Sequence, residues 1–465
     1  MLLKKINHNV ILLIFCAGIL TACGSDDTST PTDDDPPMGE FLGEPDFIKT
    51  YGGSDEDDGV SVVQANDGGY VIAGTTKSTD GDITDKTGND ADYWVLKLNS
   101  AGEKVWSKTY GGSGDDRATN ITKTSDGGYV ISGYSRSNDG DVSGNNGFQD
   151  YWILKIDTSG NLQWQKSFGF AGSDQGFKVF ETAEGNFFAT GFLDVSASGG
   201  QGNDFTPGSN GSVGGNTRNP QHGVGEFWGI LMDSQGNKLW RRYFGGTNND
   251  RSYDALQTND GGFLLVGSSE SEDFDITDAK GSYDFWAVRL TASGDLIWTK
   301  SFGGSEIDIA YSVTKTHDGN YMLVGDTRST DQDVTSLYGN ADAWAVKFSD
   351  DGTMIWQKNF GGSEFDSARS VRSMSNGRYI LSGSTRSNNN DVGSNNGQND
   401  AWLMIIDEAG SLTYEYTLGG SSLDFGNQAI ETTDSKLVLV GNTESDDIDI
   451  PLNRGIKDLL ILKLK

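Results

Sequence analysis

The sequence predicts an all-β fold, a seven-bladed β-propeller with four antiparallel strands in each blade. The first observation is that all eleven tryptophans occupy two positions of one repeating unit. Members of the first set recur at steps of 58, 76, 58, 58 and 58 residues, and each member of the second set lies twelve residues after one of the first. Such a period indicates one supersecondary unit stacked many times. The sets are Trp94, Trp152, Trp228, Trp286, Trp344 and Trp402, then Trp106, Trp164, Trp240, Trp298 and Trp356.

The second observation is a glycine pair that opens each unit and sets the number of units at seven. A degenerate copy at 169–172 fills the one slot that has no intact pair. The intact pairs are Gly52-Gly53, Gly111-Gly112, Gly245-Gly246, Gly303-Gly304, Gly361-Gly362 and Gly419-Gly420.

The third observation is the pattern inside one unit, where segments 51–65, 70–76, 93–99 and 103–110 are rich in β-branched and aromatic residues. Tight Gly-containing turns join the first segment to the second and the third to the fourth, as in β-hairpins. A longer polar loop, 78–92, joins the second to the third. Four antiparallel strands in each unit describe a propeller blade.

The two ends of the chain predict how the ring closes. The last unit stops after its third strand, at 459–465, and has no fourth. The segment 46–51 matches a fourth strand, with Phe47 in the place of Trp106. We therefore expect the N-terminal strand to close the last blade, which removes a pair of free sheet edges.

These motifs resemble a β-propeller repeat family of bacterial and archaeal secreted proteins. The shared patterns are W-x-K-x-[FY]-G-G-S-x-x-D and D-G-G-[YF]-x-x-x-G, and the match spans residues 46 to 465. Lys108 and Lys166 hold the lysine position. The resemblance implies the fold and no particular activity. The acidic position is held by Asp57, Asp116, Asp250, Asp308, Asp366 and Asp424.

Residues 1–22 have the pattern of a secretion signal, with Lys4 and Lys5 before an apolar run too short to span a membrane. The sequence Leu-Thr-Ala-Cys that ends at Cys23 resembles the lipobox of bacterial lipoproteins. The resemblance implies diacylglycerol on the Cys23 thiol, cleavage before it and N-acylation, including palmitate. The alternative is an ordinary signal peptide with an incidental cysteine. The remaining cysteine, Cys16, leaves with the signal, so the mature chain has no internal disulfide.

Residues 23–44 are acidic, rich in proline and nearly free of apolar side chains, which predicts a disordered tether. Acidic residues directly after the lipidated cysteine resemble the surface-export signal of Bacteroidetes lipoproteins. This implies the outer face of the cell outer membrane, with a periplasmic location as the alternative. The net charge of −32 argues against nucleic acid as a partner.

The strand order of a propeller places the glycine-pair loops and the long second loops on one face, which we call the loop face. The long loops repeat an Asp-x-Asp element. In one interpretation these carboxylates bond backbone N–H groups and hold the loops rigid. In the other, some of them bind Ca²⁺, which needs six to eight oxygen ligands. The Ca²⁺ candidates are Asp80, Asp82, Asp139, Asp141, Asp331 and Asp333.

The third blade carries an insertion at about 192–225 that accounts for the 76-residue step. It contains the candidate ligand-binding residues Phe205, Arg218 and His222 among many Asn and Gly residues. Amide side chains bond sugar hydroxyls well, and the ring of Phe205 can stack on a sugar. A tolerated surface insertion is the alternative interpretation.

Two functions compete, besides a purely structural scaffold. The first is a non-enzymatic, surface-anchored binding lipoprotein that engages an extracellular polysaccharide or partner outer-membrane proteins of a glycan-uptake system. The second is a polysaccharide-degrading enzyme of the lyase type. No catalytic triad, zinc spacing or phosphate loop is present in the sequence, and we assign no catalytic residue. A cluster of Arg or Lys with His or Tyr at the channel mouth would favour the second.

Overall fold

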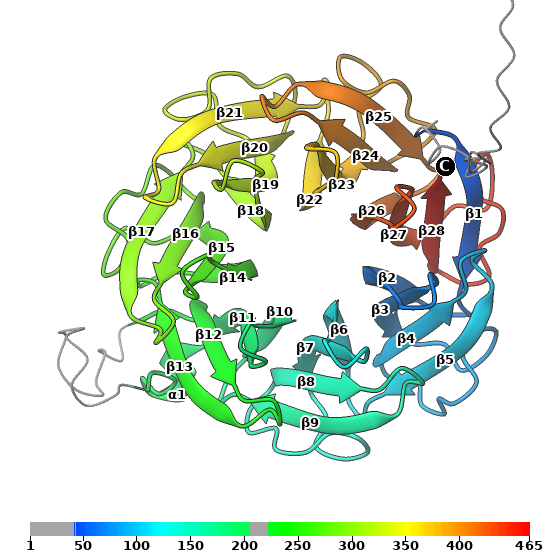
Figure 1. Cartoon of the computed structure of the whole chain (residues 1–465), viewed down its shortest axis with the longest axis horizontal. Helices are drawn as coiled ribbons and strands as arrows, with labels where there is room; N and C mark the ends of the chain where they lie inside the picture. Colours follow the sequence, from blue (N-terminus) through cyan, green and yellow to red (C-terminus); the bar gives the residue numbers. More distant parts are fainter. Residues whose placement is uncertain (1–40, 42, 205–221) are drawn as a thin grey trace, which may run out of the picture. The chain divides into compact units, whose positions relative to one another are not determined.

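The computed structural model describes residues 41, 43–204 and 222–465. These residues form seven four-stranded antiparallel sheets arranged as blades around a central channel (Figure 1). The predicted seven-bladed β-propeller is confirmed. A single short helix, α1 (Val195–Ser198), interrupts the β-structure of the described residues. None of the described residues belongs to a helix with the length and hydropathy needed to cross a bilayer.

Strands are numbered along the chain, and each blade runs from its inner to its outer strand. Blade 1 consists of β2 (Asp57–Gln64), β3 (Tyr70–Thr76), β4 (Asp92–Leu98) and β5 (Lys104–Tyr110). Blade 2 consists of β6 (Asp116–Lys123), β7 (Tyr129–Ser135), β8 (Asp150–Ile156) and β9 (Leu162–Phe168). Blade 3 consists of β10 (Gln175–Glu181), β11 (Phe187–Leu193), β12 (Glu226–Met232) and β13 (Lys238–Phe244).

Blades 4 to 7 follow the same plan. Blade 4 consists of β14 (Asp250–Gln257), β15 (Phe263–Ser269), β16 (Asp284–Leu290) and β17 (Leu296–Phe302). Blade 5 consists of β18 (Asp308–Lys315), β19 (Tyr321–Thr327), β20 (Asp342–Phe348) and β21 (Met354–Phe360). Blade 6 consists of β22 (Asp366–Ser373), β23 (Tyr379–Thr385), β24 (Asp400–Ile406) and β25 (Leu412–Leu418). Blade 7 consists of β26 (Asp424–Glu431), β27 (Leu437–Thr443), β28 (Asp458–Leu464) and the N-terminal β1 (Pro45–Tyr51).

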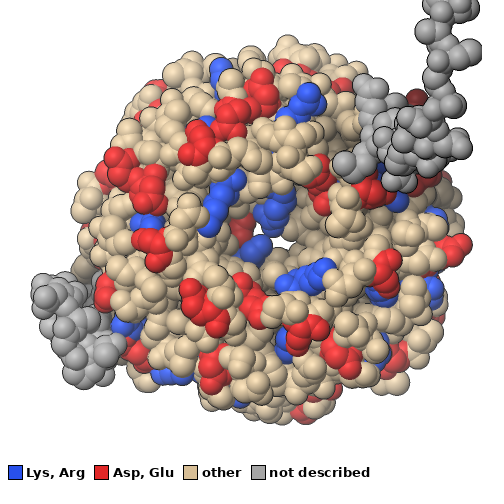
Figure 2. All heavy atoms as spheres, viewed as in Figure 1, with Lys and Arg blue, Asp and Glu red and all other residues tan. Residues whose placement is uncertain are grey.

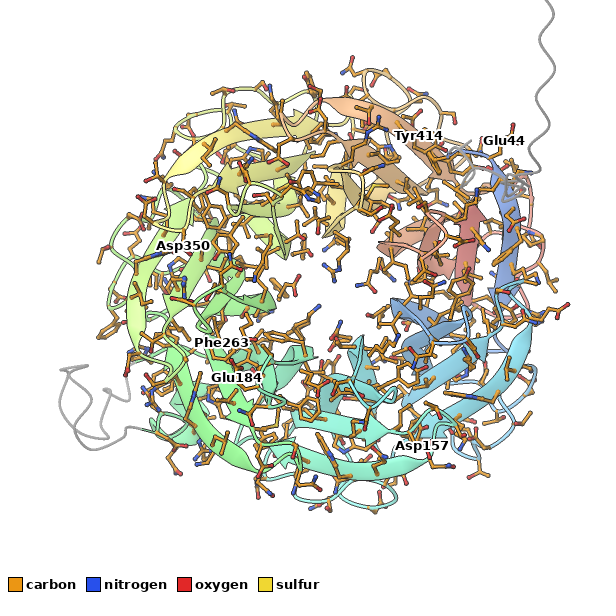
Figure 3. The ribbon with its side chains drawn as sticks, in the orientation of Figure 1. Glu44, Asp157, Glu184, Phe263, Asp350 and Tyr414 are labelled. Carbon is orange, nitrogen blue, oxygen red and sulfur yellow. The ribbon has the colours of Figure 1, made fainter. Side chains whose placement is uncertain are left out.

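Ring closure takes the predicted form, because β1 pairs antiparallel with β28. Phe47 lies opposite Lys463 and Tyr51 opposite Leu459, so residues from the two ends of the chain share one sheet. The segment before β1 also contacts the propeller. Gly43 N–H donates to the Lys465 carbonyl at 2.9 Å, and the hydroxyl of Tyr414 donates to the Gly43 carbonyl at 2.7 Å. Figure 3 labels Tyr414 close to this closure.

The first set of tryptophans is buried between adjacent blades. Each of them lies on the third strand, and all six are at most 1% exposed. The residue before such a tryptophan reaches the next blade. The rings of Tyr93 and Trp152 are 4.6 Å apart, and the Tyr93 hydroxyl donates to the Trp152 carbonyl at 2.8 Å. Large rings thus fill the gap between twisted sheets, at distances that favour aromatic pairs.

The second set of tryptophans covers the tight turn of the following blade. Gly294 is the left-handed residue of such a turn, with φ +80°, and a Cβ added there would lie 2.9 Å from the ring of Trp240. Glycine is therefore needed at this turn both for its backbone angle and for its small size. Similar close approaches place Trp106 over Gly160, Trp164 over Gly236 and Trp356 over Gly410.

A buried aspartate opens the inner strands and ties the glycine-pair loops to the sheets. In blade 1, Asp57 accepts hydrogen bonds from Gly53 N–H at 2.6 Å, from Ser78 Oγ at 2.7 Å and from Thr76 Oγ1. The same pattern of bonds recurs around Asp116, Asp250, Asp308, Asp366 and Asp424. In blade 3 the two hydroxyl positions hold Leu193 and Val195, so Asp174 lacks these donors. Burial raises the Asp174 pKa to about 8.

A second buried acid, at the start of the third strand, faces this aspartate across the glycine pair. At the ring closure, a Cβ added to Gly52 would lie 2.5 Å from Asp458 Oδ1 and 2.7 Å from Asp57 Oδ2. Burial, with the Asp57 charge beside it, raises the Asp458 pKa to about 6. Burial raises the pKa of equivalent acids to about 6 for Asp150, Asp342 and Asp400 and to about 7 for Asp92 and Asp284.

Removing β1 should open the ring, because β28 then becomes an exposed edge strand. We expect a chain that begins at residue 52 to unfold at a markedly lower temperature and to self-associate, while a chain that begins at residue 41 keeps the parent behaviour. Thermal unfolding and size-exclusion chromatography of the two truncations measure this. Equal unfolding temperatures for the two truncated chains would contradict a role of β1 in closing the ring.

The raised carboxyl pKa values predict a protein that becomes less stable from about pH 5 to pH 8. A group with a raised folded pKa binds a proton more tightly when folded, so its contribution is complete below the unfolded value near 3.8 and is lost as the pH rises through the folded value. A carboxyl whose pKa is higher by one when folded contributes about 1.4 kcal/mol in this way. We expect the melting temperature to fall between pH 5 and pH 8.

The variant Asp284→Asn should reduce this pH dependence. In the parent, Lys280 N–H donates to Asp284 Oδ2 at 2.5 Å, and the amide oxygen of the variant can still accept this bond. The NH₂ group of the variant would then face the Asp308 carboxylate. The exposed Asp85→Asn is the matched control and should leave the dependence unchanged. An identical pH profile for all three proteins would rule out the buried acid pairs as its source.

Candidate functional site in the central channel

The repeated Asp-x-Asp carboxylates are engaged by backbone N–H groups of the glycine-pair loops. In blade 1, Asp80 Oδ1 accepts from Ser54 N–H at 2.7 Å and Asp82 Oδ2 from Gly52 N–H at 3.2 Å. In blade 6 the first position is Asn389, whose Oδ1 accepts from Ser363 N–H at 2.9 Å. An uncharged amide oxygen therefore accepts the same loop N–H bond that a carboxylate oxygen accepts in blade 1. The bonds repeat at Asp139, Asp141, Asp273, Asp275, Asp331, Asp333, Asp391 and Asp447.

These bonds favour the structural interpretation of the loop acids, and Ca²⁺ binding stays a prediction. Asp139 and Asp141 line an acidic pocket of about 460 Å³ between blades 1 and 2. The ammonium of Lys86 lies in it, 3.2 Å from Asp92 and donating to the Gly88 carbonyl at 2.7 Å. In the described part of the chain, no three or more His, Cys, Asp or Glu side chains are grouped closely enough to hold a metal ion.

The insertion of blade 3 contributes one described candidate residue. Phe205 and Arg218 lie outside the described residues. His222 is 4% exposed, its ring stacks on Phe274 at 4.5 Å, and its Nδ1 lies 3.2 Å from Glu226 Oε2. His222 does not line the central channel, and its contacts support the loop that carries it.

A second candidate site is the wall of the central channel, which is formed by the seven inner strands. Each inner strand contains a β-bulge at the same position. In blade 1 the pairing shifts between Gly59 and Ser61, which leaves Val60 as the extra residue. A bulge re-aims a side chain, and bulges are common next to functional sites. The bulge residues are Val60, Thr119, Phe177, Tyr253, Tyr311, Arg369 and Asn427.

The bulge residues, together with the residue that follows each of them, line the narrow middle of the channel, a space of about 90 Å³. It joins a wider pocket of about 590 Å³, because Lys178, Asp254, Arg372 and Gln428 line both. The wider pocket is formed by the ends of the inner strands on the face of the tight turns. Its volume is in the range that small-molecule sites occupy.

An ion cluster occupies the middle of this wall. Asp254 Oδ1 lies 3.4 Å from Lys178 Nζ, and its Oδ2 lies 3.8 Å from Arg372 Nη1. Asp254 Oδ2 also accepts from Ser312 Oγ at 2.8 Å and from Val313 N–H at 3.1 Å. Burial would raise the Asp254 pKa, but the two cations outweigh it and the pKa is lowered. Burial lowers the pKa of Lys178, and the Asp254 charge opposes that shift. One carboxylate thus faces two cations.

Aromatic side chains form an arc along the same wall. The rings of Phe177 and Tyr253 are 5.1 Å apart and those of Tyr253 and Tyr311 are 5.5 Å apart. The guanidinium of Arg369 lies 3.9 Å from the Tyr311 ring centre, a cation–π contact. Blades 3 to 6 therefore present three rings and a guanidinium in succession.

The channel differs in charge from the rest of the protein. Among the described residues, its lining includes two carboxylates, Asp254 and Glu431, and five cations, which are Lys123, Lys178, Lys315, Arg369 and Arg372. The whole chain has a net charge of −32. Figure 2 shows blue side chains around the central opening, with red side chains spread over the surrounding blades. Charges of one sign in a concave site focus the field and attract ions of the other sign.

These channel residues were not predicted from the sequence, because the sequence pattern that predicts the fold consists of the residues that recur from blade to blade. Gly52, Asp57 and the turn glycines recur since every blade needs them. The bulge positions differ from blade to blade, with Val, Thr, Phe, Tyr, Tyr, Arg and Asn in order. Variation at one register position inside a strict repeat was the signal available in the sequence.

Comparisons with known proteins add little to this geometry. No known protein family matches the sequence, and neither does any curated protein. Among solved structures, a protein of unknown function from Bacteroides caccae is 11% identical, with a TM-score of 0.40, over 71% of this chain and 94% of that one. The Pan2 WD40 domain of Neurospora crassa is 8% identical, with a TM-score of 0.47, over 87% and 89%. A β-xylosidase/α-arabinofuranosidase from a compost microbial metagenome is 14% identical, with a TM-score of 0.30, over 62% and 90%.

The loop acids can be tested through Asp331, whose Oδ1 accepts from Ser305 N–H at 2.8 Å. We expect Asp331→Ala to lose about 1–2 kcal/mol of unfolding free energy, because a loop N–H loses its partner. Asp331→Asn should stay close to the parent, as Asn389 does in blade 6. Chemical denaturation with and without millimolar CaCl₂ measures both. Stabilisation by Ca²⁺ that both variants abolish would favour the metal interpretation.

Proposed function

We propose that the protein is a lipid-anchored binding protein of the bacterial cell surface that holds its ligand in the central channel. The observation that carries this proposal is the contrast between repeated and varied residues. The repeated polar groups bond within the scaffold, whereas the varied residues Lys178, Tyr253, Tyr311, Arg369 and Arg372 converge on one cavity. A cavity with a few convergent polar groups and aromatic walls is the usual form of a ligand site.

The anchor belongs to the proposal on sequence grounds. Lipidation at Cys23, with palmitate among the acyl chains, holds the chain at the outer membrane, and the acidic segment 23–44 is the tether between the anchor and the propeller. Several acyl chains together anchor a protein stably where one would not. Polysaccharide, or an outer-membrane partner of a glycan-uptake system, is the ligand class that fits a surface-anchored module. The negative charge of the chain disfavours nucleic acid.

The lyase alternative gains one observation, because cations and tyrosines do meet in the channel. Elimination on a uronate needs a base that is deprotonated near neutral pH. Burial, together with the Asp326 charge, raises the pKa of Tyr311 well above its usual range, which opposes that role. Burial lowers the pKa of Lys178, which favours a base, but the Asp254 carboxylate 3.4 Å away opposes that shift and pairs with the ammonium. The geometry therefore supports binding better than proton abstraction.

The anchor is tested with Cys23→Ser. We expect this variant to lose incorporation of a palmitate analogue in cells and to leave the membrane fraction, while the parent incorporates the label. Protease accessibility on intact cells separates the outer surface from the periplasm. Labelling of Cys23→Ser at the parent level would overturn lipidation at this residue.

Ligand binding is tested by a glycan array with the detergent-solubilised, full-length protein. We expect binding without product release, and we expect Val60→Trp to abolish it because the added ring fills the narrow middle of the channel. Val105→Trp is the matched control, since Val105 is 57% exposed on the outer strand β5. Binding that survives Val60→Trp would place the site elsewhere, and release of cleaved glycan would make the protein an enzyme.

A further inference from the structure

The channel cations are only partly balanced within the described wall. Five cationic side chains and two carboxylates line the two joined cavities, and a third carboxylate, the buried Asp326, interacts electrostatically with Arg369 and Tyr311, which leaves a surplus of two positive charges. One carboxylate, Asp254, is already shared between Lys178 and Arg372. The other carboxylate of the lining, Glu431, accepts from the backbone N–H and the hydroxyl of Ser375, at 2.6 and 2.9 Å.

The positions of the cations extend along the channel rather than around one point. Arg369 lies at the bulge level, against the Tyr311 ring. Arg372 and Lys178 lie next to Asp254, and Lys123 is the last residue of the inner strand β6. A ligand with anionic groups at more than one depth would meet a cation at each level. Charge-assisted hydrogen bonds of this kind are roughly twice as strong as neutral ones.

We infer that the channel binds the end of an acidic oligosaccharide, with sugar carboxylates against Arg369, Arg372 and Lys123 and a pyranose ring against Tyr253 and Tyr311. This inference rests on the proposed binding function and names its ligand class. The aromatic faces supply apolar contact for the sugar ring, and their phenol groups supply hydrogen-bonding partners. The cations select the acidic sugar over a neutral one.

The acidic exterior limits how such a ligand enters. The whole chain has a net charge of −32, whereas the channel lining is positive, so a long polyanion lying across the blades is repelled while a chain end inside the channel is attracted. The narrow middle of about 90 Å³ leaves no room for a folded polymer. Chain ends are therefore the part of an acidic polysaccharide that the geometry admits.

The experiment compares two trisaccharides of equal length by isothermal titration calorimetry on the detergent-solubilised, full-length protein. The acidic probe is trigalacturonate and the neutral probe is cellotriose. We expect the acidic probe to bind more tightly, with an affinity that falls as NaCl rises from 50 to 300 mM. Arg369→Gln and Lys123→Gln should each weaken it about tenfold, the usual loss for one charged hydrogen bond.

The matched control is Lys108→Gln, on the outer strand β5, which should bind as the parent does. Thermal unfolding confirms that each variant folds, and both channel variants remove exposed side chains. Equal affinity for the two probes, or channel variants that bind as the parent does, would overturn the acidic-sugar inference. If neither probe binds while the glycan array shows another ligand, this inference fails and the binding function stands. If neither probe binds and the glycan array also shows no ligand, both the acidic-sugar inference and the proposed binding function fail.

Discussion

The pairing of β1 with β28 is the contact on which the other features of the propeller depend. Each blade buries one side against the next, so an open row of seven would leave two unmatched faces and two free edges. Pairing the first strand of the chain with the last turns that row into a ring. The ring brings seven inner strands to one axis, and only then do side chains that are hundreds of residues apart, such as Ser61 and Gln428, share a hydrogen bond.

Two kinds of polar residue follow from this architecture. Those that recur from blade to blade, including Asp57, Asp80 and their equivalents, accept hydrogen bonds from backbone N–H groups of the glycine-pair loops. Burial raises the pKa of many acids at the blade junctions, including Asp458, so these groups link stability to pH. Lys178 and Arg372 have no counterpart of the same charge at their positions in the other blades. Asp254 combines both kinds, because it faces these cations while its Oδ2 accepts from Val313 N–H, as Gln428 Oε1 accepts from Val62 N–H. A scaffold built by repetition leaves the residues that break the repeat available for a ligand.

Charge has to be considered at the scale of the site as well as the whole chain. A net charge of −32 means that the surface repels long polyanions. The wall of the channel has the opposite sign, because Asp254 balances only part of the charge of Lys178 and Arg372. The net charge of the chain therefore does not describe the charge along its axis. Sequence patterns favour Phe205 and Arg218 over these channel residues because a long insertion is conspicuous, whereas the inner strands look like ordinary repeats.

The sequence by itself determined the number of blades, the strand order and the closing strand. Those features depend on local periodicity, as when Phe47 takes the position of Trp106 in the pattern. Only the tertiary structure decided which side chains face the axis, because a bulge in each inner strand shifts the alternation of faces by one residue, as at Val60 and Tyr253. It also decided that Asp80 bonds a loop amide and that Arg369 meets Tyr311 from the neighbouring blade. Contacts between neighbouring blades join residues that are about one repeat apart in the sequence. A local sequence pattern does not predict the direction in which these side chains point.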